Sequence, residues 1–492
     1  MEETDPKKVE KTVIIGLECH IQLTTLKTKL FCSCSADYHG KEPNTLVCPT
    51  CIGLPGSLPV VNKEVIKYAI MAALALNAKI SNTLLFFRKN YYYPDMPKNF
   101  QISQYDRVGG VALAENGYVT IHIDGRSKKI RISRMHLEED PARITYFGSI
   151  ETSPYALIDY NRAGMALLEV VTEPDMRSPE EAQTFLRKLR SIIEHLGISD
   201  GSLPGAMRCD TNISLAGGKR VEIKNVSSFK EVRRAIQYEI LRQKQLLRRG
   251  VSVKQETRHW DEARRITISL RTKETEQDYR YFPEPDLVPI DITKEMIEEA
   301  EELMPELPDA RRTRLMKEYK LPKHDAVVLT GSKQLADFFE ESVKLYPNSK
   351  RISNWIMGDL LRNLNETGLE INESKITTQG LIDLLRLIDE GVISGKIAKS
   401  ILPEMVRTGK HPAEIVRDRG LTIISDEEEI NTVIDEVFTE FPEAVEDALS
   451  EESAVNYLIG QVMKKTKGRV DPQLTNQIIR TKLNDMKKRI PP

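Results

Sequence analysis

Apolar and polar residues alternate along the segment from Ile15 to Leu23, near the start of the chain. The apolar residues occupy the odd positions, which are Ile15, Leu17, Cys19, Ile21 and Leu23. The even positions include Glu18, His20 and Gln22. Since successive side chains of a β-strand point to opposite faces, this pattern predicts a strand whose odd face is buried. Its even face then carries a carboxylate beside an imidazole, which is typical of a metal or phosphate site.

Further patterns predict that helices and strands alternate through the first part of the chain. Apolar residues at helical spacing predict helices over Lys63–Asn77, Pro179–Leu196 and Glu231–Gln245. The second helix follows Ser178 and has proline at its first position, which is a common helix start. Shorter apolar runs predict strands, which lie within residues 128–140, 165–171, 221–225 and 255–271.

The second part of the chain has a different composition and predicts helices only. Residues 291–309 contain eight acidic residues and one lysine. The patterns that follow predict helices within residues 333–345, 351–364 and 377–405. The change in composition after Ile290 and the Lys410–Pro412 segment mark candidate domain boundaries.

Composition excludes several classes of protein. The chain has 492 residues, of which 40% are hydrophobic and 29% charged, as expected of a soluble protein with two to four domains. Met1–Lys11 lacks the apolar core of a signal peptide, and the longest apolar run, Ala69–Ala78, is too short to span a membrane. Six cysteines are too few for a disulfide scaffold, so we expect a reducing, cytoplasmic setting without membrane attachment.

Four of the cysteines form two closely spaced pairs. They are Cys32, Cys34, Cys48 and Cys51, and 13 residues separate the pairs. Two such thiolate pairs can close a tetrahedron around zinc, which predicts a structural zinc site in an otherwise irregular loop. The alternative is a set of unrelated buried or redox cysteines. Cys19 and Cys209 stand apart from the four, and we expect both to be packing residues.

Carboxylates gather in two other predicted strands. Glu138, Glu139 and Asp140 close one strand, and three adjacent acids are costly unless they are solvated, paired or bound to a cation. Since Ile130 and Ile132 share parity with Glu138, periodicity does not decide which of Glu138 and Glu139 faces a site. Glu169 lies among apolar residues of another strand and needs a partner. The alternative for the acidic triplet is a turn in water.

Basic and aromatic residues supply two candidate contacts for nucleotides or nucleic acid. Lys89 precedes three tyrosines and a proline-rich loop that ends at Lys98. These lysines can bind phosphate and the tyrosines can stack on bases, although a solvated loop is an equal alternative. Near the C-terminus, residues 421–463 hold twelve acidic and no basic residues, whereas residues 464–492 hold nine basic and two acidic residues. The basic end can dock on a phosphate backbone, or can simply be a solvated face; its first cations are Lys464, Lys465, Lys467 and Arg469.

Long motifs over nearly the whole chain resemble the GatB family of aspartyl/glutamyl-tRNA amidotransferase subunits. They lie at residues 16–23, 93–98, 101–105, 136–140, 159–164, 168–175, 279–287 and 460–464. The related GatE subunits carry an inserted domain for which this chain has no room. The chain departs from the family pattern at Cys19, at Met165-Ala166, and at residues 141–143 beside the acidic triplet.

The resemblance implies an α+β fold in three domains. Residues 1–293 are expected to form a catalytic cradle around a mixed or antiparallel sheet, with the zinc site. Residues 294–410 are expected to form a helical domain, and residues 411–492 a small YqeY-like helical tail that binds tRNA.

The resemblance also implies a reaction, in which the side-chain carboxylate of misacylated Asp-tRNA(Asn) or Glu-tRNA(Gln) is phosphorylated by ATP and then amidated. Magnesium and basic groups must offset the repulsion between the anions. We expect Glu18, His20 and Glu139 to bind magnesium, with Glu138 and Glu169 in the same acidic shell. Histidine is an unusual magnesium ligand, so His20 is open to a water-mediated role. Lys89 and Arg208 are expected to bind phosphates.

The expected partners follow from the same resemblance. The chain carries no amidase-type or glutaminase-type motif, so ammonia is expected from GatA, with GatC holding the subunits together. Aminoacyl-tRNA is the expected substrate, and a non-discriminating aminoacyl-tRNA synthetase is a further expected partner. Two other functions fit the residues alone, a non-catalytic zinc-stabilised tRNA-binding protein and a metal-dependent hydrolase.

Overall fold

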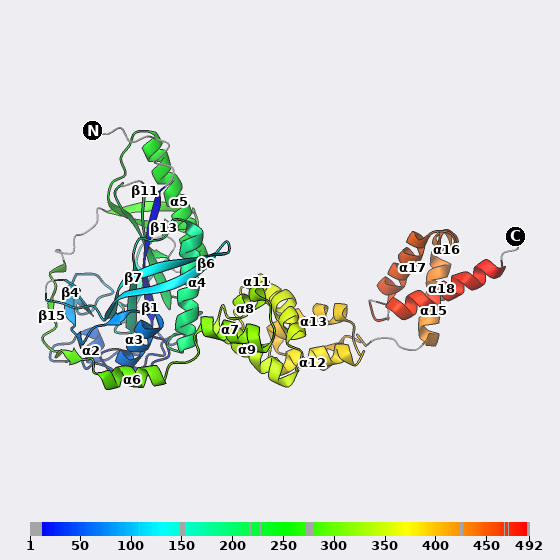
Figure 1. Cartoon of the computed structure of the whole chain (residues 1–492), viewed down its shortest axis with the longest axis horizontal. Coiled ribbons are helices and arrows are strands. Elements are labelled where there is room, and N and C mark those ends of the chain that lie inside the picture. The colour runs from blue at the N-terminus through cyan, green and yellow to red at the C-terminus, as the bar shows by residue number, and fades with distance from the viewer. Residues whose placement is uncertain are drawn as a thin grey trace. The chain divides into compact units, whose positions relative to one another are not determined.

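The computed structural model describes residues 12–107, 109–147, 153–215, 218–226, 228–271, 279–422, 427–466, 468–470 and 472–489. The chain divides into two compact units, which are described separately (Figure 1). Unit 1 comprises residues 1–311 and 331–333, and unit 2 comprises residues 312–330 and 334–492. Within the described residues, no helix is long and apolar enough to cross a membrane.

A mixed sheet forms the centre of unit 1, with nine strands among the described residues. Its order is β14 (Ile266–Arg271), β13 (Glu256–Asp261), β12 (Val221–Val226), β11 (Met207–Leu215), β1 (Val13–Gln22), β10 (Ala166–Thr172), β7 (Arg126–Glu139), β6 (Ala114–Ile123) and β2 (Lys79–Ile80). Neighbouring strands are antiparallel except β12 and β13, which are parallel. The predicted strand at Ile15–Leu23 is therefore central, with β10 on one side and β11 on the other.

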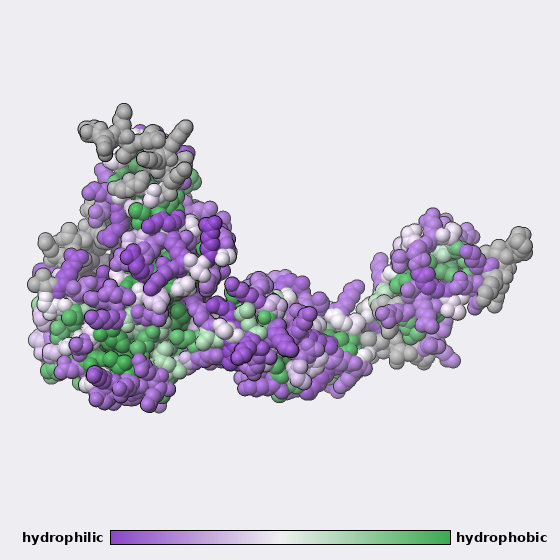
Figure 2. Space-filling view, viewed as in Figure 1, coloured by the Kyte–Doolittle hydropathy of each residue, from purple (hydrophilic) through white to green (hydrophobic). Residues whose placement is uncertain are grey.

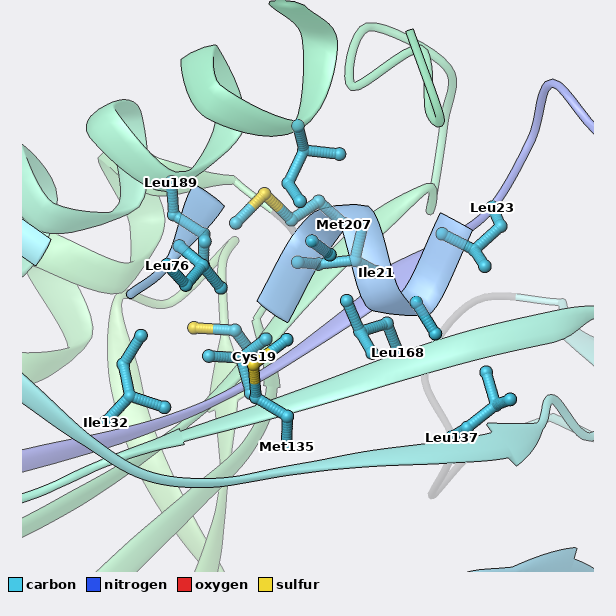
Figure 3. Packing of buried hydrophobic residues seen from close by; sticks show 14 of the residues in the cluster. Cys19, Ile21, Leu23, Leu76, Ile132, Met135, Leu137, Leu168, Leu189 and Met207 are labelled. Atoms are coloured by element: carbon cyan, nitrogen blue, oxygen red, sulfur yellow. The ribbon is translucent and has the colours of Figure 1, made fainter. Parts of the chain in front are cut away.

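The odd face of β1 is buried, as the alternation predicts. Cys19, Ile21 and Leu23 have at most 1% of their surface exposed. They belong to a hydrophobic core that includes residues of helices α3 (Lys63–Ala75) and α4 (Pro179–Leu196), and Figure 3 shows them in this cluster together with Leu76 and Leu189. Because the odd face packs in this core, the polar side chains of β1 lie on its even face.

The helices of unit 1 begin and end where local sequence favours it. Ser178 accepts a hydrogen bond from the Glu181 N–H at the start of α4, Pro179 is its first residue, and Gly197 ends it with a φ of 73°. The helix predicted within Glu231–Gln245 is longer in the structure, where α5 runs over Phe229–Arg248. Helices α4 and α5 pack on each other and against strands β6 and β11, respectively.

A β-bulge in β7 explains why periodicity could not assign the face of Glu138. The pairing of β7 with β10 shifts between Val171 and Thr172, which lie opposite Arg134 and Ile132. Ser133 is thus an extra residue in β7 relative to β10, and an extra residue exchanges the two faces of a strand. The buried residues accordingly change from the even positions Ile130 and Ile132 to the odd positions Met135 and Leu137.

Smaller elements complete unit 1. They are the sheet β15 (Phe282–Pro283), β4 (Phe87–Asn90) and β5 (Phe100–Ser103), the pair β16 (Ile290–Asp291) and β3 (Thr83–Leu84), the hairpin β8 (Arg143–Tyr146) and β9 (Ala156–Asp159), and helices α2 (Pro49–Ile52) and α6 (Lys294–Glu302). Residues 282–291 pair with strands from the start of the chain, and Ala300 of α6 packs in the core of unit 1. The domain end expected at residue 293 stays a prediction.

Unit 2 is helical throughout its described residues. Its elements are α7 (Pro308–Glu318) and α9 (Lys333–Leu345), which both begin in unit 1, together with α8 (Lys323–Leu329), α10 (Ser349–Asn354), the π-helix η2 (Trp355–Leu360), α11 (Leu361–Thr367), α12 (Thr378–Asp389), α13 (Gly395–Thr408), α14 (Pro412–Asp418), α15 (Glu427–Glu440), α16 (Pro442–Ala448), α17 (Glu452–Lys465) and α18 (Pro472–Arg489). The predicted helix 351–364 thus contains a π-helical stretch.

Apolar side chains of these helices pack together in two hydrophobic clusters. One contains residues from Leu315 to Val416, and the other residues from Ile430 to Leu483. The visible surface of the helices is mostly hydrophilic in Figure 2. The expected division at residue 410 stays a prediction. A mixed sheet with helices, followed by a helical region, confirms the predicted α+β fold class.

Candidate functional site

Charged residues meet on the even face of β1 because of the register of four strands. His20 lies opposite Glu169 of β10, and Glu169 lies opposite His136 of β7. On the other side of β1, Glu18 lies opposite Asp210 of β11. Directly opposite residues share a face of the sheet, so the register alone brings these five side chains together.

The side chains approach one another closely around His20. Its Nε2 lies 3.5 Å from Glu18 Oε1 and 3.6 Å from Glu169 Oε2. Glu138 joins the cluster from β7. Ligand atoms of Glu18, His20 and Asp210 lie within 4.8 Å of one another, and so do those of His20, Glu138 and Glu169. Of the five predicted magnesium-site residues, the structure brings together Glu18, His20, Glu138 and Glu169.

Proximity changes the pKa values of this cluster. Burial lowers the pKa of His20, but Glu169 and Glu18 outweigh burial and hold it well above 6.5. Burial raises the pKa of Glu169, but His136 and His20 outweigh burial and hold it well below 4.5. Burial and the neighbouring Glu169 both raise the pKa of Glu138. Without a cation, the imidazolium of His20 therefore offsets part of the negative charge.

The donor set fits a divalent cation that prefers oxygen. Two groups share the imidazole nitrogen of His20, one with the carboxylates of Glu18 and Asp210 and the other with those of Glu138 and Glu169, and carboxylates are hard oxygen ligands. The Nε2 atom of His136, on the same face, is buried without a hydrogen-bond partner. The residues present are thus suited to magnesium, and His20 Nε2 must lose its proton before it can bind the ion.

Glu139 lies apart from this cluster. Lys98 Nζ donates to both carboxylate oxygens of Glu139, at 2.6 Å for Oε2, and the Ile102 N–H donates to Oε1 at 2.8 Å. Glu138 points to the other face, where it accepts a hydrogen bond from Ser103 Oγ at 2.8 Å. Glu139 must leave Lys98 before it can bind a cation among the other carboxylates, so its expected role as a ligand stays a prediction.

Arg208 belongs to a buried network at the edge of the site. Its guanidinium donates to both oxygens of Asp140, at 2.7 and 3.2 Å. Arg162 lies 3.7 Å from the same carboxylate, and Gln22 Nε2 donates to it at 2.5 Å. Tyr38 OH in turn donates to Gln22 Oε1 at 3.0 Å. Two guanidinium groups share one carboxylate, which leaves net positive charge close to the acidic cluster.

Lys89 lies on the other flank, among tyrosines. Its Nζ lies 5.1 Å from the centre of the Tyr279 ring. Burial lowers the pKa of Lys89, but Tyr281 and Glu138 outweigh burial and raise it well above 10.5. Tyr281 stacks on Tyr105 with ring centres 4.5 Å apart. Tyr279 and Tyr281 thus lie beside Lys89, whereas Tyr92 and Tyr93 of the proline-rich loop are 74% and 50% exposed, so their expected stacking on bases stays a prediction.

The four clustered cysteines are brought together as their spacing predicts. The Sγ atoms of Cys32, Cys34, Cys48 and Cys51 lie within 4.8 Å of one another. The pKa of Cys51 is lowered to about 5, first by the hydrogen bond from Cys32, although burial raises it. The Cys48 N–H and Lys29 Nζ also approach Cys51 Sγ, at 3.1 and 3.8 Å. Four thiols, with donors that favour a thiolate, fit a tetrahedral zinc ion.

The basic residues of the predicted tRNA contact differ in their surroundings. Lys464 is exposed, whereas Lys465 forms ion pairs with Glu436 and Glu440 at 2.9 and 2.5 Å. Arg469 donates to two backbone carbonyls, those of Thr466 and Gly420. Lys467 lies outside the described residues. The expected contact with tRNA stays a prediction.

Sequence reasoning missed two residues of the acidic cluster, Asp210 and His136. Asp210 follows Arg208 by two residues, so it shares that residue's face, and this parity was a usable signal. Lys224 of β12 lies 3.7 Å from Asp210. His136 shares parity with Glu138, but the bulge at Ser133 concealed which face both occupy.

Comparison with known proteins covers nearly the whole chain. Residues 13–298 match the GatB/GatE catalytic domain, and residues 337–483 match the GatB domain. The B subunit of the aspartyl/glutamyl-tRNA(Asn/Gln) amidotransferase of Sulfurisphaera tokodaii is 55% identical over 469 residues, 95% of this chain and 98% of that protein. Proteins with the same name are 53% identical in Saccharolobus solfataricus (96% and 99% covered) and 50% identical in Thermotoga maritima (95% and 98% covered).

Proposed function

The chain belongs to the GatB family of tRNA-dependent amidotransferase subunits, and from this premise we propose that it catalyses the ATP-dependent amidation step. The substrate is the Asp or Glu side chain of misacylated Asp-tRNA(Asn) or Glu-tRNA(Gln), and the products are Asn-tRNA(Asn) or Gln-tRNA(Gln). The observation that carries this proposal is the convergence of Glu18, His20, Glu138, Glu169 and Asp210 on one face of the sheet.

The chemistry needs a site that holds anions together. A carboxylate oxygen attacks the γ-phosphorus of ATP, ADP leaves, and ammonia then displaces phosphate from the acyl phosphate to give the amide. Bound magnesium would neutralise charge on the phosphates during the first step. Glu18, His20, Glu138 and Glu169 are the residues that would hold it, Asp210 is placed to join them, and Glu139 would join them on leaving Lys98.

The cations beside the cluster serve the anionic substrates. Lys89 of β4 lies close enough to Glu138 for that carboxylate to raise its pKa, and its Nζ lies 5.1 Å from the centre of the Tyr279 ring. Arg208 is held by Asp140, and a guanidinium fixed in this way can bind a phosphate oxygen without losing much conformational freedom. We assign to both residues the binding of ATP or acyl-phosphate oxygens.

Other parts of the chain have supporting roles in this proposal. The four cysteines would hold a structural zinc ion that fixes the loop around α2. Residues 1–293 act as the catalytic cradle, residues 294–410 as a helical domain, and residues 411–492 as a tRNA-binding tail. The exposure of Lys464, and the clustering of Lys465, Lys467 and Arg469 beside it in the sequence, support a contact with the phosphate backbone.

The relatives are named as one component of a larger enzyme, which supports assembly of this chain with other subunits. We propose that GatA supplies ammonia, that GatC holds GatA and this chain together, and that the complex works in the cytoplasm, with a non-discriminating synthetase as the source of misacylated tRNA.

The test is an amidation assay with purified GatA, GatC, ATP, glutamine and each misacylated tRNA. The proposal predicts amidated tRNA only when ATP, glutamine and this chain are all present. Binding of tRNA without ATP consumption would favour a non-catalytic RNA-binding protein, and hydrolysis of a substrate without ATP or partners would favour a metal-dependent hydrolase.

A further inference from the structure

A pocket in unit 2 lies apart from the acidic cluster, beside the π-helix η2. Its volume is about 500 Å³, and it is lined by Asp325, Asn354, Trp355, Met357, Gly358, Asp359 and Lys399. These residues come from α8, from the continuous helix 349–367 and from α13, which Figure 1 labels close to one another. All of them belong to unit 2.

The π-helix gives the pocket its shape. The Leu361 N–H bonds to the carbonyl of Ile356, five residues earlier instead of four, so the helix is wider at this point. Such π-helical stretches are rare and are frequently found at functional sites. A Cβ atom added to Gly358 would meet nothing within 4 Å, so packing does not require glycine there. The open space beside Gly358 is therefore available to a ligand.

The lining groups are those that recognise a nucleotide. Lys399 Nζ lies 6.0 Å from the centre of the Trp355 ring and 3.3 Å from Asp359 Oδ2. Arg362 pairs with the other oxygen of Asp359 at 2.7 Å. An indole ring can stack on a base, a carboxylate can accept hydrogen bonds from base N–H groups, and two cations on one carboxylate leave positive charge for a phosphate.

Positive charge continues from the pocket toward the basic segment of the tail. Helix α13 carries Lys396 and Lys399 one turn apart, and both are exposed. Ser394 Oγ, at the start of α13, donates to the carbonyl of Gly468 at 3.5 Å. Helix α13, which contributes Lys399 to the pocket, thus also contacts the basic segment at Gly468, and the proposed function assigns that segment to tRNA.

We infer that this pocket binds one unstacked nucleotide of the tRNA, with the base on Trp355 and a backbone phosphate on Lys399 or Arg362. The identification of the RNA as tRNA rests on the proposed function. The site itself lies in unit 2, apart from the acidic cluster of unit 1.

Two variants of the full chain test the inference without touching the catalytic site. Gly358→Leu places a side chain at the pocket, and because the added Cβ meets open space and leucine favours helices, the fold should be unaffected. Trp355→Leu removes the stacking surface. Each should weaken tRNA binding between about 5- and 150-fold, the range for loss of one stacked base. Lys344→Gln, on α9 outside the pocket, is the control for a general loss of charge, whereas Lys399→Gln tests the proposed phosphate contact.

A spectroscopic readout separates pocket binding from general affinity. The chain has two tryptophans, and Trp260→Phe leaves Trp355 as the sole tryptophan. Saturating tRNA should quench Trp355 emission, and Gly358→Leu should abolish the quenching. The pocket assignment is wrong, while the proposed function stands, if tRNA binds without changing Trp355 emission and if the Gly358→Leu and Trp355→Leu variants bind tRNA with unchanged affinity. A response to purified GatA or GatC instead of tRNA would make the pocket a protein-docking site, and absence of any tRNA binding would overturn both proposals.

Discussion

Replacing Asp140 by asparagine removes a negative charge from between two guanidinium groups. The side chain of Asp140 is fully buried, Arg208 is 14% exposed, and the two form a bidentate pair at 2.7 and 3.2 Å. Asparagine has nearly the same size and can still accept from Gln22, so the substitution changes charge more than packing. It leaves Arg208 and Arg162 without their shared counter-ion in a buried network.

The expected loss of stability is large. Breaking a buried ion pair by removing one partner costs about 3–5 kcal/mol, because the remaining charge is left uncompensated. The matched control is Asp175→Asn, which breaks a bidentate pair with Arg131, at 2.6 and 2.9 Å, whose arginine is 63% exposed. Water compensates the exposed guanidinium, so the control should lie close to the wild type.

Urea unfolding of the full chain measures the difference. In a Trp355→Phe background the remaining tryptophan is Trp260, which is buried in unit 1 and donates to Glu231 at 2.9 Å, so its emission follows unit 1. The reasoning is refuted if Asp140→Asn destabilises unit 1 no more than Asp175→Asn does.

The same pair predicts a dependence on pH. Burial raises the pKa of Asp140, but Arg208 and Arg162 outweigh burial and hold it below 3.8. A carboxylate whose pKa is lower in the folded state stabilises the fold above its unfolded pKa, and this contribution is lost as pH falls through the folded pKa. The difference between wild type and Asp140→Asn should therefore be constant near neutral pH and shrink below about pH 3.8.

Three further predictions concern the site. Glu139→Gln removes the negative charge that neutralises Lys98 and that Glu139 would offer to magnesium. ATP-dependent amidation should therefore be abolished, while tRNA affinity is retained. Full amidation activity would exclude a role of Glu139 both as the partner of Lys98 and as a magnesium ligand. Glu169 and Glu18 outweigh burial and raise the pKa of His20 above 6.5, so a proton competes with the metal for His20. Calorimetry should therefore find that magnesium affinity rises with pH through that raised pKa. A magnesium affinity independent of pH would contradict this prediction. Elemental analysis should find zinc in the wild type and in Cys209→Ser but not in Cys51→Ser, which should also have a lower unfolding temperature; equal zinc in all three would disprove the site.

The predictions that the structure matches most closely are those based on regular periodicity and short local motifs. The strand β1 was predicted because five apolar residues alternate without interruption, and the same phase placed Glu18 and His20 on one face. The start of α4 was predicted because Ser178 and Pro179 are local signals that act within one helical turn. The cysteine cluster was predicted because zinc sites impose short spacings within each pair.

Features that depend on irregular backbone or on distant partners could not be predicted. The bulge at Ser133 has no clear sequence signal, so the face of Glu138 became known only from the pairing of β7 with β10. The ion pair between Lys98 and Glu139 joins residues 41 apart along the chain, and the partners of Lys465 on α15 depend on tertiary packing. The π-helix η2 interrupts a segment whose spacing indicates an ordinary helix.

Binding of Mn²⁺, which replaces Mg²⁺ and is visible by electron paramagnetic resonance, tests the central claim most directly. The claim is that carboxylates of β1, β7 and β10 hold one divalent cation. The wild-type chain should bind one tight ion, Glu169→Gln should bind it much more weakly, and Glu181→Gln, an ion-paired glutamate on α4 outside the cluster, should bind it as the wild type does. Equal Mn²⁺ affinity in the wild type and in Glu169→Gln would contradict the account.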